Sequence, residues 1–84
     1  MKQLPSVTKA KYLEKFVIEL TFNDGTCKAV DFSVWLKGEV FEPLKKKAFF
    51  KRFFLDGITV AWSNGADIAP ETLYEAAEVK GGVP

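Results

Sequence analysis

The chain has 84 residues, of which 48% are hydrophobic and 14% aromatic, and its formal net charge is +1. This length predicts a single domain, residues 1–84, and the apolar content excludes an intrinsically disordered chain. There is no histidine and only one cysteine, Cys27, which excludes Ser-His-Asp and Cys-His catalytic sites, an intramolecular disulfide and a cysteine-rich zinc site.

The sequence also bears on where the protein works. We find no signal peptide and no apolar run near the roughly 20 residues that span a bilayer. Small secreted domains usually depend on disulfides, so we expect a cytoplasmic protein that does not enter a membrane. Up to Arg52 there are eleven Lys or Arg and six acids, and from Phe53 onward there are one Lys and five acids. A chain with this polarity can present one charged side to a partner of opposite charge.

The first part of the chain predicts three strands. Residues 7–13 are the weaker candidate, whereas residues 16–22 alternate apolar and polar side chains, which is the period of a strand with one buried face. Asn23-Asp24-Gly25 predicts a turn, because glycine adopts a positive φ without penalty. Residues 26–31 then form the returning strand of a hairpin, with Cys27 as a small, half-buried side chain.

Two short helices are expected next. Residues 32–36 form an apolar turn for which Asp31 suits the N-cap position. Pro43 opens a second helix, because proline is favoured at the first helical position. This second helix would face Leu44 inward and its lysines, 45–47, outward.

The last part of the chain predicts a second hairpin and a helix. Residues 53–55 and 58–62 flank Asp56-Gly57, a strong hairpin signal, and Ile58, Val60 and Trp62 would share one inward face. A helix starts at Pro70 and runs to about residue 78, and we expect an ordered core over about 5–79 with 80–84 as a flexible tail. The fold class predicted is α+β, with a small antiparallel sheet of about four to five strands and two or three short helices.

A longer pattern runs through these elements and consists of Leu20-Thr21-Phe22-Asn23-Asp24-Gly25, Asp31-Phe32, Leu44, Phe49, Phe53 and Trp62-Ser63-Asn64-Gly65-Ala66-Asp67-Ile68-Ala69-Pro70-Glu71-Thr72-Leu73-Tyr74. It resembles the small bacterial domain of unknown function family 2442, over about residues 7–74. The resemblance implies a compact antiparallel α+β domain and brings no enzymatic activity. Ser63 departs from the pattern, because the family often has proline there.

The resemblance also bears on partners. Some family members are joined to a helix-turn-helix segment that binds DNA, and others lie beside small partner proteins in arrangements that resemble toxin–antitoxin pairs. This chain ends soon after Tyr74, so we expect no helix-turn-helix segment. Any regulatory role would then act through a partner or a ligand.

The residues at motif positions are interpreted as structural, and they are Asp24, Gly25, Asp31, Trp62, Asn64, Gly65, Asp67, Pro70, Leu73 and Tyr74. Asp24 and Asp67 would bind nearby backbone amides, and Asp31 would cap the helix that follows it. The alternative is that two of these carboxylates form a cation site or an acid–base pair. The loop at Ser63-Asn64-Gly65 is a plain connection or, alternatively, an anion cradle.

The candidate interaction residues are aromatic or basic, and they are Trp35, Lys45, Lys46, Lys47, Phe50, Lys51, Arg52 and Phe54. Four phenylalanines lie between positions 49 and 54, and one short helix does not turn them all toward one core. We therefore expect Phe50 and Phe54 to be exposed and Trp35 to lie at the rim of the core, where such side chains anchor interfaces.

These residues predict a protein-binding module, antitoxin-like or regulatory, whose partner is a small protein or a second copy of the chain. The alternative is an accessory domain that senses a ligand or nucleic acid. Nucleic acid is the weaker of these partners, because five basic residues are few and the net charge is near zero. We expect no enzymatic activity, cofactor or metal.

Overall fold

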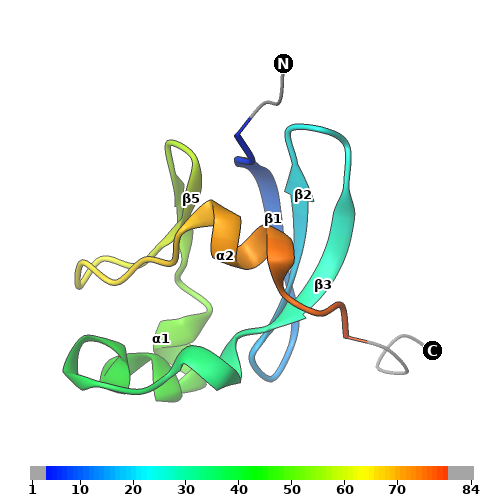
Figure 1. Cartoon of the computed structure of the whole chain (residues 1–84). Helices are drawn as coiled ribbons and strands as arrows, with labels where there is room; N and C mark the ends of the chain where they lie inside the picture. Colours follow the sequence, from blue (N-terminus) through cyan, green and yellow to red (C-terminus); the bar gives the residue numbers. More distant parts are fainter. Residues whose placement is uncertain (1–3, 80–84) are drawn as a thin grey trace.

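A computed structural model of the chain describes residues 4–79 (Figure 1). It confirms the α+β class and both predicted hairpins. Strands β1 (Val7–Glu14), β2 (Val17–Phe22) and β3 (Cys27–Asp31) form an antiparallel sheet in the order β1-β2-β3. Strands β4 (Phe54–Asp56) and β5 (Thr59–Ala61) form a separate antiparallel pair. The predicted tail, residues 80–84, lies outside the described part of the chain.

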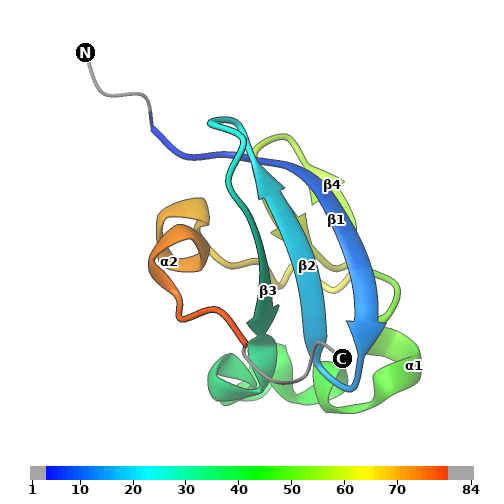
Figure 2. The ribbon, with the colours of Figure 1, turned by 90° about the vertical axis from the view of Figure 1, so that its right-hand side faces the viewer.

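Four short helical segments complete the fold of residues 4–79. Two are 3-10 helices, η1 (Phe32–Trp35) and η2 (Glu39–Lys45), and two are α-helices, α1 (Lys47–Phe50) and α2 (Pro70–Glu75). The helices and the β4–β5 hairpin lie on one side of the three-stranded sheet (Figure 1). The opposite face of that sheet, which is turned to the viewer in Figure 2, is not covered by any of the described helices or strands.

Strand β2 supplies the centre of the core as its alternation predicts. Ile18, Leu20 and Phe22 point to one side and are at most 1% exposed. Their cross-strand partners on β3 include Val30, which pairs with Ile18, and Lys28, which pairs with Leu20. Because directly paired residues share a face, Lys28 lies on the inward face and Cys27 on the outward one. The expectation that Cys27 is half-buried is therefore wrong, and its side chain is exposed.

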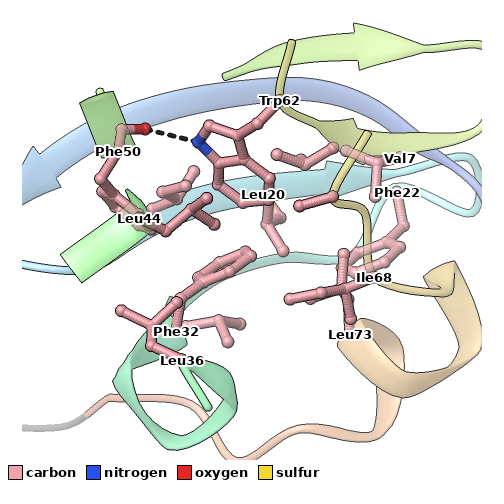
Figure 3. Close-up of a cluster of buried hydrophobic side chains, with 14 residues drawn as sticks. Val7, Leu20, Phe22, Phe32, Leu36, Leu44, Phe50, Trp62, Ile68 and Leu73 are labelled. Atoms are coloured by element: carbon pink, nitrogen blue, oxygen red, sulfur yellow. Dashed lines mark hydrogen bonds between the residues drawn. The ribbon is translucent and has the colours of Figure 1, made fainter. Parts of the chain in front are cut away.

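The core collects apolar side chains from every part of the described chain (Figure 3). Trp62 is buried in this core, and its indole Nε1 donates a hydrogen bond to the carbonyl oxygen of Phe50 over 2.8 Å. This bond satisfies the one polar atom of a buried tryptophan, which is the condition for burying it without loss. Ile58 does not join Val60 and Trp62 in the core, because it lies in the two-residue loop before β5 and is 57% exposed.

Two of the predicted helices have different bounds in the structure. The helix expected from Pro43 is two segments, because Lys46 between η2 and α1 has an extended backbone with φ −86° and ψ 119°. Helix α2 stops at Glu75 instead of residue 78, because Ala76 is extended with ψ 148°. Beyond it the amide of Val79 donates to the carbonyl of Ala29 on β3 over 2.8 Å. The chain after α2 therefore lies along the β3 edge of the sheet.

Candidate protein interface

The predicted turn around Asp24 forms, and it is hydrogen-bonded to helix α2. Gly25 adopts φ +90°, and Asp24 Oδ1 accepts a hydrogen bond from the Thr26 amide over 2.9 Å, as expected. Asp24 Oδ2 accepts a second bond from the Tyr74 hydroxyl, 50 residues away in sequence. The Tyr74 hydroxyl and then the Thr26 amide lower the pKa of Asp24 below its ordinary value of 3.8, because both favour the charged carboxylate. The two ends of the motif pattern are thus joined directly.

The lysine next to the exposed cysteine completes this contact between α2 and the sheet. The ammonium of Lys28 donates to the carbonyl of Tyr74, and to that of Ala76 over 2.8 Å. It also lies 5.5 Å from the centre of the Tyr74 ring. A cation placed on the last carbonyls of a helix satisfies groups that have no partner within the helix. This role was not predicted from the sequence, because it depends on the register that places Lys28 opposite Leu20.

The loop between β5 and α2 is held by Asn64. Its Oδ1 accepts from the Ala66 amide over 3.2 Å, and its Nδ2 donates to the Val40 carbonyl over 2.8 Å. The Gly65 amide donates to the carbonyl of Trp62, with Gly65 at φ +93°. One backbone amide of the suggested anion cradle, that of Gly65, is therefore already bonded within the protein, which favours the plain connection.

The motif aspartates do not all behave as predicted. Asp31 caps η1 as expected, because its Oδ1 accepts from the Ser33 amide over 2.9 Å. Asp67 does not, since its exposed carboxylate makes no hydrogen bond to any residue in 4–79, and α2 has no side-chain cap. Within the described residues, no group of three or more His, Cys, Asp or Glu is placed to hold a metal ion.

Phe50 is not an interface residue. It is 0% exposed, and the rings of Tyr12, Phe16, Phe32 and Trp62 lie 5.2 to 6.3 Å from its own. The expectation that it is exposed is wrong, because the four phenylalanines between 49 and 54 do not share one helix. Helix α1 ends at Phe50, so Phe50 turns into the core while Phe54 begins β4.

The other predicted interaction residues lie at or near the surface. Phe54 is 47% exposed, and Trp35 is half-buried with its ring 5.3 Å from that of Phe32. The basic residues Lys45, Lys46, Lys47, Lys51 and Arg52 are all exposed. Lys45 pairs with Glu42 over 3.1 Å, which is the only ion pair within 4.0 Å in residues 4–79. Lys51 instead lies 5.2 Å from the centre of the Tyr12 ring.

Three large apolar side chains on the second hairpin are exposed and lie close together in sequence. Phe54, Leu55 and Ile58 are 47%, 40% and 57% exposed, and we call them the hairpin surface. Leu55 and Ile58 were not among the predicted interaction residues. The signal that could have found them is the loop itself, because a two-residue turn at Gly57-Ile58 places Ile58 outside the buried face of β5.

A shallow depression lies beside the hairpin surface. It has a volume of about 460 Å³ and is lined by Thr8, Lys9, Ala10, Lys11, Glu19, Thr21 and Leu55. Four of these residues are consecutive on β1, two come from β2 and one comes from β4. The depression therefore joins the outward side of the three-stranded sheet to the hairpin surface through Leu55.

Comparison with protein-family models matches residues 7–79 to the family described as "Protein of unknown function (DUF2442)". The chain belongs to this family. Comparison with curated proteins and with solved structures gives no match. None of the described helices of this DUF2442 domain has the length and apolar character to cross a bilayer.

The residues of this DUF2442 domain now fall into two groups. Among those that carry the family pattern, Asp24, Trp62 and Tyr74 have their polar groups bonded inside the fold, whereas the carboxylate of Asp67 is exposed. Phe54, Leu55 and Ile58 lie outside the pattern and are exposed. Residues of the family pattern therefore stabilise the fold, and the candidate interface consists of exposed residues that are not part of the pattern.

Proposed function

We propose that this DUF2442 domain is a protein-binding module, and that the hairpin surface is its contact site. The observation that carries the proposal is the exposure of three large apolar side chains, Phe54, Leu55 and Ile58, within five positions of one hairpin. Apolar groups left in water at one place gain free energy when a partner covers them, and aromatic side chains are enriched among interface anchors. The regulatory or antitoxin-like role that the family resemblance implies is the form of this function that we propose.

The second candidate, an accessory domain that binds nucleic acid, is favoured by the exposed basic residues between positions 45 and 52. It is weakened by the position of the aromatic rings. Of the four phenylalanines in this part of the chain, Phe50 is buried, Phe49 and Phe53 are half-buried, and only Phe54 is exposed to stack on a base. Binding to labelled single-stranded DNA that falls steeply with salt would favour this candidate over ours.

The test of protein binding compares two pairs of exposed apolar residues. Tagged wild-type protein is incubated with bacterial cytoplasmic extract, the setting that we propose, and recovered proteins are identified by mass spectrometry. The same is done with Leu55→Asp/Ile58→Asp and with a matched control, Val34→Asp/Val40→Asp, whose native side chains are 63% and 44% exposed. We expect one protein to be recovered with wild type and control and lost with the hairpin variant.

The result that contradicts the proposal is equal recovery by all three proteins, or loss from both variants alike. Urea unfolding of each variant shows whether it is folded, because a loss of binding that accompanies unfolding says nothing about the surface. A second copy of the chain as the partner is tested by sedimentation of the wild type alone, which would then show a dimer that Leu55→Asp/Ile58→Asp dissociates.

A further inference from the structure

Four cations lie in or near this area, since two line the depression and two come shortly before the hairpin surface in the chain. They are Lys9 and Lys11 on β1 and Lys51 and Arg52 at the end of α1, and we call them the basic rim. All four are exposed, and none is within 4.0 Å of an acidic partner among residues 4–79. Glu19 is the one acid in the lining of the depression, opposite Lys11 on the neighbouring strand.

The rim and the hairpin surface are parts of one area. Leu55 lines the depression together with β1 residues 8–11, and Lys51 lies over the ring of Tyr12 at 5.2 Å. Residues 51–55 therefore run beside β1, with Leu55 near its middle and Lys51 further toward its end. Positive charge thus lies on β1 near Leu55 and in the residues shortly before Phe54.

The backbone of β1 makes few hydrogen bonds outside its own sheet. β1 and β3 are the two edge strands of their sheet. The β3 edge is met by the chain itself, where the amide of Val79 bonds to Ala29. On β1, in the described part of the chain, the hydrogen bond from the Val7 amide to the Ile58 carbonyl is the only backbone bond outside the β1–β2 pair. Backbone groups that have no hydrogen-bond partner at the edge of a sheet are a template for an added strand.

We propose that the depression and the basic rim bind an extended, acidic segment of the protein partner, which lies along β1 and presses an apolar side chain against the hairpin surface. This inference rests on the proposed function and specifies its partner. Added strands gain affinity from main-chain hydrogen bonds and specificity from neighbouring side chains. Four unpaired cations select carboxylates on that segment.

A second copy of this chain fits the same surface poorly. Most dimers form through the same patch on both copies, and this would bring two basic rims together. Like charges facing each other across an interface cost free energy, so the charge of the rim favours a different, acidic chain.

The test uses a fluorescein-labelled peptide, Asp-Leu-Glu-Phe-Asp-Leu-Glu, in which acidic and apolar residues alternate as they do on the two faces of a strand. A control peptide carries Lys in place of each acid. Binding to the full chain is measured by fluorescence anisotropy at low and high ionic strength. We expect the acidic peptide to bind, the basic peptide not to bind, and the affinity to fall with salt, since the charged groups are exposed.

Two variants with equal changes in charge locate the site. Lys9→Glu/Lys11→Glu changes the rim, and Lys46→Glu/Lys47→Glu changes exposed lysines outside the depression. We expect the rim variant to weaken binding by at least about tenfold, roughly the effect of two exposed ion pairs, and the other to change it by less than about threefold. Absence of binding by the acidic peptide, equal binding of the two peptides, or equal weakening by both variants would overturn the inference.

The outcomes for this inference and for the proposed function are separate. If the hairpin variant loses its protein partner but the acidic peptide does not bind, the proposed function stands and this inference fails. If the partner is recovered equally with the hairpin variant, the proposed function fails, whatever the peptide does.

Discussion

The two hairpins of this domain share an Asp-Gly turn and differ in what their side chains do. At the first turn, Asn23 bonds to Ser6 and Leu4, and Asp24 bonds to Thr26 and Tyr74. At the second, the exposed carboxylate of Asp56 makes no hydrogen bond to any described residue, and the neighbouring apolar side chains face solvent. The same Asp-Gly sequence therefore belongs to a turn that is bonded to the rest of the fold in the first hairpin, and to a turn beside exposed apolar side chains in the second.

The largest expected difference in stability is between variants of two phenylalanines that are four positions apart, Phe50 and Phe54. Phe50→Ala removes a fully buried ring and should lower the free energy of unfolding by about 3–5 kcal/mol. Phe54→Ala removes a ring that is 47% exposed and should cost less than about 1 kcal/mol. Urea unfolding measures both. Equal losses would mean that the division between core and hairpin surface is wrong.

A smaller effect is expected at the junction of α2 with the sheet. Lys28→Met keeps the apolar stem but removes the donor to the Tyr74 and Ala76 carbonyls, which should cost about 1–2 kcal/mol. Hydrogen exchange of the Val79 amide, which bonds to Ala29, should become faster in the variant. Unchanged exchange and stability would show that the ammonium does not hold this segment.

The bond between the first turn and α2 predicts a dependence on pH. The pKa of Asp24 is lowered in the folded protein, so its contribution is present above the ordinary value of 3.8 and is lost as pH falls through the lowered value. Tyr74→Phe removes the largest cause and keeps the ring, whose centre lies 5.0 Å from that of Phe22. Wild type should melt at a higher temperature than the variant at pH 7, and this difference should shrink below about pH 4. A constant difference between pH 7 and pH 3 would contradict the bond.

The smallest expected effect compares the two turn aspartates directly. Asp56→Ala should change the stability by no more than about 0.5 kcal/mol, since the side chain is exposed and has no hydrogen-bond partner in residues 4–79. Asp24→Ala should be clearly less stable than wild type, because it loses two partners. Thermal unfolding of the two variants side by side measures the difference, and a reversed order would refute the comparison.

Local signals predicted much of the fold. The alternation over residues 16–22, the turn at Gly25 and the N-cap at Asp31 were correct, because each depends on residues close in sequence. The motif interpretation of Asp24 and Trp62 as structural residues agrees with their hydrogen bonds.

Properties set by distant contacts were not predictable. Phe50 is buried because rings from β1, η1 and the end of β5 surround it, and Lys28 faces inward because β2 sets the register of β3. The end of α2 depends on Lys28 and on the bond between Val79 and Ala29. For the candidate interface, the sequence indicated Phe54, Lys51 and Arg52 but not Leu55, Lys9 or Lys11. Lys9 and Lys11 belong to it because they lie on β1, and Leu55 because it lies beside β1.

The most direct test of the account is the amount of protein partner recovered by one variant from each hairpin. We expect Asp24→Ala, assayed at low temperature where it is folded, to recover the partner as well as wild type does. Leu55→Asp/Ile58→Asp, with the urea midpoint of wild type, should recover none. If the hairpin variant keeps the partner and Asp24→Ala loses it while still folded, the contact lies at the first turn and the account is wrong.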